Sequence, residues 1–281
     1  MDNTAIEALP PLREVIAEHE LAAKKALGQN FLLDLNLTRK IARAGKAAGG
    51  QWAAEKVVEI GPGPGGLTRA LLLEDAAQVI AVERDERCLA ALAPVVQAAA
   101  GRLTLQAGDA LETDLAALCE GTPYQIVANL PYNIATPLLL RWLLAPQPPR
   151  RLTVLVQKEV AERIAAPAGS DAYGRLSVIM QWCAEVRLLF DIGPKAFVPP
   201  PKVTSTLVEL VPRATPLAEA ETGKLERVTA AAFGQRRKML RSALKSLWPD
   251  AEARLSALGI EPTRRAETLN IEEFCALARA L

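Results

Sequence analysis

The tetrapeptide Asn129-Leu130-Pro131-Tyr132 directly follows the apolar run 124–128 and contains the residue types that can hold an exocyclic amine. The amine of adenine is a poor nucleophile because its lone pair is delocalised into the ring. The amide oxygen of Asn129 and the carbonyl oxygen of Leu130 can accept both amine hydrogens and leave this lone pair available. Pro131 stiffens the turn that aims the carbonyl, and Tyr132 offers a flat face to a purine. The motif indicates chemistry on the N6 amine of a base, although an ordinary strand-to-loop turn also favours Asn and Pro.

A glycine-rich segment predicts a binding site for a nucleoside-containing cofactor. The β-branched run 56–60 is followed by the sequence GPGPGG at 61–66 and by a helical stretch at 67–73. Glycines let a ligand approach the backbone closely, and the start of a helix offers N–H groups. A second strand, 78–82, ends in Glu83, whose carboxylate would meet ribose hydroxyls.

The wider pattern predicts a Rossmann-like α/β sheet. A third strand, 103–106, leads to Asp109, whose carboxylate can accept a hydrogen bond from an adenine amino group. Strands and helices alternate from about Val57 to Val211, which is typical of a doubly wound sheet with ligand sites at the carboxyl ends of its strands. The ends of these strands and of the strand before Asn129 should therefore converge on one crevice. A helix from Leu32 to Ala48 is expected ahead of the sheet.

The glycine spacing alone does not decide which cofactor binds. Gly61, Gly63 and Gly66 match the G-x-G-x-x-G spacing of NAD enzymes. Pro62 and Pro64 each remove an N–H donor from the loop, which disfavours a pyrophosphate cradle. S-adenosylmethionine has no phosphate, and methyl transfer to an amine explains the motif at 129–132, whereas hydride transfer does not.

Basic residues gather in two places, although the net charge of the chain is only +1. Between Arg227 and Pro249 no acidic residue occurs, and the pattern predicts one helix with a broad basic surface that can lie along phosphates. A solvated helix face would explain the same charges. Lys158 and Arg163 form the second group, where nearby glutamates at i,i+4 spacing could neutralise the charge. The basic residues of the first group are Arg236, Arg237, Lys238, Arg241 and Lys245.

With these motifs in order along nearly its whole length, the chain resembles the ribosomal RNA adenine dimethylase family. The resemblance rests on residues 24–32, 59–63, 129–134, 157–163, 173–178, 197–203 and 236–238. It implies S-adenosylmethionine-dependent dimethylation of the N6 amines of two adjacent adenines in the 3′-terminal hairpin of small-subunit (16S) rRNA. The substrate it implies is a late small-subunit precursor, and the expected role lies in ribosome biogenesis.

The resemblance also assigns site residues. The cofactor positions are Asn30, Leu32, Gly61, Gly63, Glu83, Asp109 and Asn129. The positions around the target base are Asn129, Leu130, Pro131, Tyr132 and Phe197, and the RNA-binding positions are Lys158, Arg163, Arg236, Arg237, Lys238 and Arg241. Two departures from the family pattern are Asn30, where many relatives carry His, and residues 1–22, which extend beyond the shared start.

Phe197 has two interpretations. The prolines at 199–201 hold an extended loop that can present Phe197 opposite Tyr132, so that the two rings sandwich a flipped base. A phenylalanine that fills the core is the plainer interpretation, because aromatic side chains are usually interior.

Length and composition predict a monomeric cytoplasmic enzyme with three parts. These are an N-terminal extension (1–22), a Rossmann-like methyltransferase domain (23–212) and a helical RNA-binding domain (213–281) whose last helix begins near Asn270. The chain has no apolar run long enough for a membrane span and no signal-peptide pattern. Its four cysteines lack C-x-x-C spacing, and its single histidine, His19, lies in the N-terminal stretch that we expect to be mobile, so no metal site is expected.

Two alternatives remain open from the sequence. One is a Rossmann-type dehydrogenase that binds NAD. The other is a non-catalytic assembly factor that uses the same fold to bind ribosomal RNA.

Overall fold

The computed structural model describes residues 2–21, 29–47, 52 and 54–281, which belong to two compact units. The first unit comprises residues 1–158 and 188–211, and it contains most of the sheet. The second unit comprises residues 159–187 and 212–281, and it is mainly helical.

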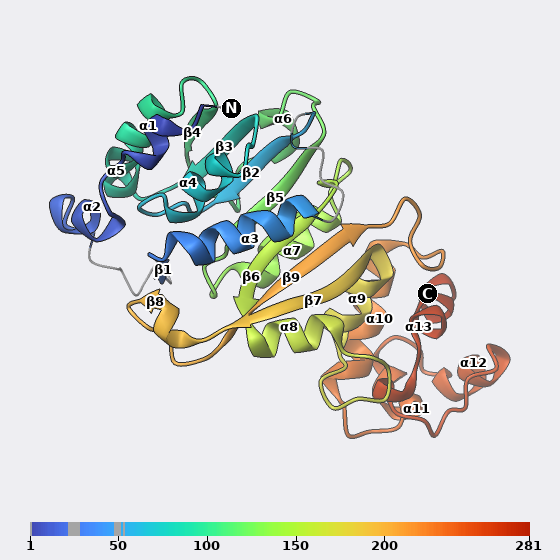
Figure 1. Ribbon diagram of the computed structural model, residues 1–281. Coiled ribbons are helices and arrows are strands. Elements are labelled where there is room, and N and C mark those ends of the chain that lie inside the picture. The colour runs from blue at the N-terminus through green and yellow to red at the C-terminus, as the bar shows by residue number, and fades with distance from the viewer. Residues whose placement is uncertain (1, 22–28, 48–51, 53) are drawn as a thin grey trace. The chain divides into compact units, whose positions relative to one another are not determined.

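Seven strands form one sheet with the order β4-β3-β2-β5-β6-β9-β7 (Figure 1). The five strands from β4 to β6 pair in parallel, and β9 pairs antiparallel with β6. This order confirms the predicted doubly wound α/β fold. The bounds are β2 (Lys56–Ile60), β3 (Gln78–Glu83), β4 (Leu103–Ala107), β5 (Tyr124–Asn129), β6 (Leu152–Gln157), β7 (Ala184–Ile192) and β9 (Ser205–Pro212).

The direction of the chain through the sheet creates a crevice. β3 and β4 lie on one side of β2, whereas β5 and β6 lie on its other side, so the strand order reverses between β2 and β5. In open parallel sheets, ligands bind at the carboxyl ends of the strands beside such a reversal. The residues at 61–63 and 129–132 follow these two strands and are therefore brought to the same edge.

Helices α3, α4 and α5 share a hydrophobic core with one face of this sheet. Ile41, Leu71 and Leu92 from the helices pack in one buried cluster with Val57 and Val127 from the strands. The central strands are apolar on both faces, as expected for parallel strands covered on both sides. After its N-terminal segment, this unit has the helices α3 (Leu35–Ala47), α4 (Gly66–Leu73), α5 (Glu86–Ala98), α6 (Leu115–Leu118) and α7 (Ala135–Leu143), with a 3-10 turn at Pro194–Ala196.

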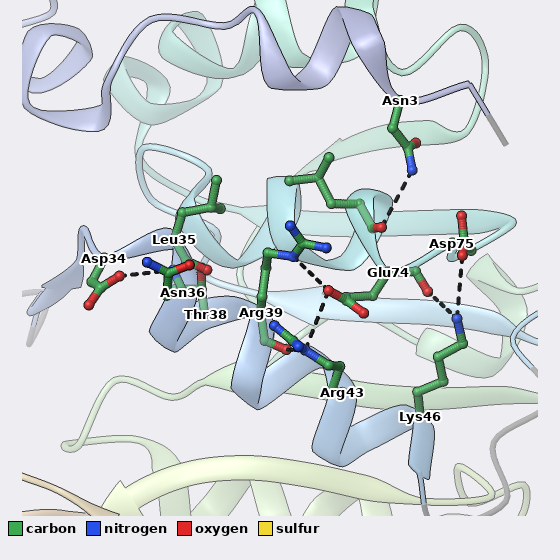
Figure 2. A network of polar contacts seen from close by, with 11 residues as sticks. Asn3, Asp34, Leu35, Asn36, Thr38, Arg39, Arg43, Lys46, Glu74 and Asp75 are labelled. Carbon is green, nitrogen blue, oxygen red and sulfur yellow. Dashed lines mark hydrogen bonds and ion pairs between the residues drawn. The ribbon is translucent and has the colours of Figure 1, made fainter.

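A network of polar contacts joins α3 to the end of α4 (Figure 2). Arg39 Nε donates to Glu74 Oε1 at 2.6 Å, and Lys46 Nζ donates to the Glu74 carbonyl at 2.6 Å. The helix was predicted to begin at Leu32, but it begins at Leu35, because Asp34 Oδ1 accepts the Asn36 N–H at 2.8 Å at its start. Phe31 and Leu32 instead form a short strand, β1 (Phe31–Leu32), which pairs with β8 (Phe197–Val198).

The N-terminal segment is part of the first unit. It forms α1 (Thr4–Glu7) and α2 (Leu12–Glu18), and Ile6, Leu12 and Val15 are buried. Residues 2–21 therefore pack within the first unit, and the predicted division of the chain after residue 22 and the mobility of this segment stay predictions. The apolar residues of these short helices cover helices α4 and α5, and His19 only ends α2.

The second unit includes residues that the sequence analysis assigns to the sheet domain. Residues 159–187 pack with the C-terminal helices, because α9 contacts α10 and α13, and Trp182 Nε1 donates to the Ala218 carbonyl at 2.8 Å. None of the helices in the described ranges is long and apolar enough to cross a membrane. The helices are α8 (Lys158–Ala165), α9 (Arg175–Cys183), α10 (Thr222–Gly234), α11 (Leu240–Ala243), α12 (Ala251–Ala257) and α13 (Ile271–Arg279), with 3-10 turns at Leu244–Ser246 and Ala266–Thr268.

The sequence predicts the start of α13 correctly but does not predict the end of α10. Asn270 caps α13 as predicted, with its side chain accepting the Glu273 N–H at 2.8 Å. The single basic helix was wrong, because α10 ends at Gly234 and α11 begins only at Leu240. Glycine is a poor helix former, and the basic residues after Gly234 lie in a turn and in the short α11.

Candidate active site

A pocket lies in the first unit at the carboxyl ends of β2, β3, β4 and β5. Its empty space is about 800 Å³, which includes space open to solvent. Its lining includes nine of the predicted site residues. The lining residues that carry the argument are Asn30, Gly61, Gly63, Glu83, Asp109, Asn129, Leu130, Pro131 and Tyr132.

The glycine loop at 61–65 adopts a backbone that other residues rarely adopt. Gly61 and Gly63 have φ angles of +67° and +56°. A Cβ at Gly63 would lie 2.8 Å from the ring of Phe31, so a side chain there would displace this ring. The Gly61 N–H donates to the Val82 carbonyl at 2.9 Å, which ties the start of the loop to β3. The loop thus brings bare backbone to the pocket wall.

Glu83 ends β3 with its carboxylate held by backbone N–H groups. Oε1 accepts from the N–H groups of Arg84 and Asp85, each at 2.8 Å, and Oε2 accepts from Gly63 at 3.2 Å. Burial raises the pKa of this carboxyl, and the backbone hydrogen bonds oppose that rise. Hydroxyl donors from a ribose would add to these bonds and stabilise the ionised form. The position therefore suits the sugar of a nucleoside.

Asp109 and Arg84 form an ion pair at the same rim. Arg84 Nη1 lies 3.0 Å from Asp109 Oδ2, while Asp109 Oδ1 accepts the Leu111 N–H at 2.9 Å. The pair is half exposed, so it can rearrange around a ligand at little cost in free energy.

The donors and acceptors of the pocket fit a neutral nucleoside better than a pyrophosphate. Two carboxylates, Glu83 and Asp109, line it together with apolar Ile60, Val82 and Ala110. The left-handed glycines leave room for a ligand, and the prolines at 62 and 64 have no N–H for a phosphate. A cofactor with adenosine and no phosphate suits these groups.

Asn129 is oriented by a hydrogen bond to the backbone of the segment before β1. Its Nδ2 donates to the Asn30 carbonyl at 2.9 Å. Because the nitrogen and the oxygen of an amide lie on opposite sides, this bond assigns Oδ1 as the acceptor on the other side. The side chain is half-buried at the pocket. An acceptor is thus fixed in place beside the cofactor loop.

The rest of the acceptor motif is equally well supported. The Leu130 N–H donates to the Leu155 carbonyl of β6 at 3.2 Å, which fixes the peptide ahead of Pro131. Tyr132 is half-buried, and its hydroxyl lies 2.7 Å from Ser205 Oγ. Burial raises the pKa of Tyr132, so its hydroxyl stays protonated at neutral pH. Tyr132 is thereby held through the neighbouring backbone at one end and through Ser205 of β9 at its hydroxyl.

Two of the predicted site residues lie outside the pocket wall. Leu32 is 5% exposed and Phe197 is 2% exposed, and both belong to the hydrophobic core beneath β1 and β8. The Leu32 carbonyl lies 2.5 Å from where a Cβ on Gly66 would stand, so Leu32 packs on the start of α4. Phe197 therefore fills the core, as the plainer of its two interpretations predicts. Its role in stacking on a base stays a prediction.

Several residues that line the pocket, and one buried acid, were not predicted from the sequence. Gln29, Phe31, Arg84 and Asn133 also line the pocket, and each is adjacent in sequence to a predicted residue, which was the available signal. Glu59 is 1% exposed and accepts a hydrogen bond from Thr68 Oγ1 at 2.6 Å. Burial raises its pKa to about 8.

The basic residues predicted to bind RNA differ in their surroundings. Lys158 belongs to the first unit, where its Nζ lies 2.6 Å from Asp191 Oδ2. The others belong to the second unit, where Arg163, Arg237 and Lys238 are exposed and Arg241 lies 3.3 Å from Glu252.

Arg236 is engaged by backbone carbonyls of its own unit. Its Nη1 donates to Tyr173 at 2.7 Å, and its Nη2 donates to Asp171 at 2.7 Å and to Ser170 at 3.4 Å. Arg236 therefore holds the loop between α8 and α9. Among the described residues, no group of three His, Cys, Asp or Glu side chains is arranged to bind a metal ion.

The sheet order, the glycine loop and the pocket define a Rossmann-like methyltransferase fold. A crystal structure of a dimethyladenosine transferase from Plasmodium falciparum superposes with a TM-score of 0.73 at 24% identity, covering 87% of this chain and 94% of that one. A crystal structure of the 23S rRNA methyltransferase ErmE superposes with a TM-score of 0.67 at 26% identity, covering 90% of this chain and 99% of that one.

The sequence comparisons give the family. The model of the family "Ribosomal RNA adenine dimethylase" matches residues 20–281. A relative from Rhodospirillum rubrum, "Ribosomal RNA small subunit methyltransferase A", is 58% identical over 279 residues, which cover 99% of this chain and 95% of the relative. A relative with the same name from Paramagnetospirillum magneticum is 60% identical over 273 residues, covering 97% and 95%. The chain belongs to the ribosomal RNA adenine dimethylase family.

Membership confirms the resemblance seen in the sequence. The protein is an rRNA-modifying methyltransferase, and its cofactor is S-adenosylmethionine. The dehydrogenase alternative is excluded.

Proposed function

We propose that the protein dimethylates the N6 amines of two adjacent adenines in the 3′-terminal hairpin of small-subunit (16S) rRNA. It acts as a monomer in the cytoplasm on a late precursor of the small subunit, and thereby takes part in ribosome biogenesis. The family description and the name of the relatives support an adenine acceptor in small-subunit rRNA. The observation that carries the proposal is the Asn129 amide, held by the Asn30 carbonyl so that its oxygen is the remaining acceptor.

The cofactor side of the pocket is formed by the glycine loop and two carboxylates. Glu83 accepts hydrogen bonds from the ribose hydroxyls, and Asp109 accepts one from the adenine amino group. Asn30, Gly61 and Gly63 contribute backbone at the pocket wall, while Leu32 acts through the backbone of β1. When bound, S-adenosylmethionine supplies an activated methyl group attached to a good leaving group.

The acceptor side is formed by Asn129 and Leu130. The Asn129 Oδ1 and the Leu130 carbonyl accept both hydrogens of the target amine and direct its lone pair toward the cofactor side. Positioning and these two preorganised acceptors supply the acceleration. No strong base is needed, because the amine loses its proton only as the new N–C bond forms. After the first transfer one acceptor still binds the remaining hydrogen, so the second methylation uses the same pocket.

The target base stacks on Tyr132. The Tyr132 hydroxyl is anchored by Ser205, which keeps the ring at the rim. Stacking on one aromatic face contributes about 1–3 kcal/mol. Phe197 supplies the second face, which requires its buried ring to turn out of the core. Lys158, Arg163, Arg237, Lys238 and Arg241 contact phosphates, since exposed cations gain affinity by releasing counterions.

The proposal is tested with purified protein, radiolabelled S-adenosylmethionine and small subunits from a strain that lacks this modification. After digestion, the label should be in N6,N6-dimethyladenosine, and naked rRNA should be a poorer acceptor than the precursor. Label in a different nucleoside would contradict the proposal that the N6 amine of adenine is the methyl acceptor. Bound cofactor without any label would favour the assembly-factor alternative.

A further inference from the structure

The segment 3–21 contacts both elements that leave the cofactor loops, and it lies ahead of most of the residues that the family model matches, which begin at 20. α4 follows the glycine loop, and α5 follows Glu83. Any element that fixes α4 and α5 also fixes the distance between the two walls of the cofactor pocket. Each of these contacts is within the first unit.

The first contact is between Arg69 of α4 and the Pro10 carbonyl, with Nη1 and the oxygen 2.6 Å apart. Arg69 is 5% exposed, and its buried Nε has no hydrogen-bond partner among the residues that the structure describes. Burial lowers its pKa. An apolar side chain of the same length would fill this space without burying a charge, so the specific contribution of Arg69 is its bond to Pro10.

The second contact is between Leu12 of α2 and Gly66, the first residue of α4. A Cβ on Gly66 would lie 3.1 Å from Leu12 Cδ1. Leu12 is buried, and it packs directly on the helix that begins after the glycine loop. At the other end of this helix, Asn3 Nδ2 donates to the Leu73 carbonyl at 3.4 Å (Figure 2).

The third contact reaches Glu83 through two side chains. Arg87 Nη1 donates to the Glu20 carbonyl at 3.1 Å, and the same guanidinium binds Asp85 through Nη2 and Oδ2 at 2.8 Å. The Asp85 N–H donates to Glu83 Oε1 at 2.8 Å. Val15 and Leu21 add a small apolar cluster with α5. The carboxylate that faces the ribose is therefore linked to the end of the N-terminal segment.

We infer that residues 3–21 position the cofactor pocket, with Arg69 and Leu12 as positioning residues for S-adenosylmethionine binding. The inference rests on the proposed roles of Glu83 and the glycine loop. A pocket held in its binding conformation loses less conformational entropy when the ligand binds. Loosening the segment should thus weaken cofactor binding and leave the acceptor side unaffected.

The test compares Arg69→Met and Leu12→Ala with Leu152→Ala. Leu152 is a fully buried leucine at the amino end of β6, whereas the pocket lies at the carboxyl ends of the parallel strands. Leu152→Ala is therefore the matched control for destabilisation. We expect the Kd and the KM for S-adenosylmethionine to rise roughly threefold to tenfold in both variants, as the loss of one or two contacts would produce. kcat and the KM for the subunit should stay near wild type. Arg69→Lys, which retains a donor, should restore part of the affinity.

The results distinguish a failure of this inference from a failure of the proposed function. If Arg69→Met and Leu12→Ala lower Tm as Leu152→Ala does and leave the Kd unchanged, the segment only stabilises the fold and the inference is wrong. If Leu12→Ala does not fold, Leu12→Val carries the same comparison. Wild-type protein that binds no S-adenosylmethionine would instead overturn the proposed function of the pocket.

Discussion

At the scale of single residues, Asn129 combines two tasks in one amide. Its nitrogen donates to the Asn30 carbonyl, and in the proposed mechanism its oxygen accepts a hydrogen of the target amine. Glu83 similarly has both carboxylate oxygens held by backbone N–H groups at the pocket wall. Asn129 and Glu83 thus obtain their orientation from the main chain.

Asn129→Ala should reduce methyl transfer by about 100-fold or more, because one of two preorganised acceptors is removed. The variant should still bind S-adenosylmethionine within roughly tenfold of wild type, because Glu83 and the glycine loop remain. Single-turnover methylation and calorimetric titration measure the two effects separately. Wild-type rates in a folded Asn129→Ala protein would show that the amide does not hold the acceptor.

Glu59 provides a pH test. Burial raises its pKa from the ordinary 4.5 to about 8. Between these values the unfolded chain has lost a proton that the folded protein keeps, so the stability contributed by Glu59 falls as the pH rises through this window, by up to ~1.4 kcal/mol per pH unit. Glu59→Gln should lack this loss, and its Tm should increase relative to wild type between pH 5 and pH 8. Parallel Tm curves would mean that Glu59 is ionised in the folded protein.

At the scale of elements, the turn from Gln235 to Met239 separates basic residues that the sequence presents as one cluster. Arg236 binds carbonyls of the loop before α9, whereas Arg237 and Lys238 are exposed. A structural cation and two exposed cations, which we propose bind phosphates, therefore follow one another along the chain.

Arg237→Ala and Lys238→Ala should each weaken rRNA binding and reduce the salt dependence of log K by about one. Arg236→Ala should instead lower the free energy of unfolding by roughly 1–3 kcal/mol, since three backbone carbonyls lose a charged donor. Binding titrations at several salt concentrations and thermal unfolding distinguish the two classes, with the exposed Arg265→Ala as a control. An Arg236→Ala protein of wild-type Tm with a reduced salt slope would reverse this assignment.

At the scale of the whole molecule, the features that the sequence predicted correctly are those that depend on residues close together in the chain. The strand at Lys56–Ile60, the glycine loop after it and the Asn270 cap depend on neighbouring residues and were predicted from them. The place of Phe197 depends on the pairing of β1 with β8, more than 160 residues apart in sequence, and the partner of Arg236 lies 63 residues away. Such contacts leave no periodic trace in the sequence.

The same reasoning applies to the packing of the N-terminal segment, which was not predicted from the sequence. Its helices are only four and seven residues long, too short to be stable alone. Their stability comes from burial of Ile6, Leu12 and Val15 against α4 and α5. The polar contacts of Asn3 with residues 73 and 102 and of Arg69 with residue 10 add to this burial and are equally nonlocal.

The most direct test of the central claim is to count the modified nucleosides in a strain in which this protein is the only enzyme of its family. Mass spectrometry of its mature small-subunit RNA should find two adjacent N6,N6-dimethyladenosines in the 3′-terminal hairpin, and both should disappear with Asn129→Ala. Unmodified adenines in cells with folded wild-type protein, or dimethylation that persists in the Asn129→Ala strain, would contradict the account.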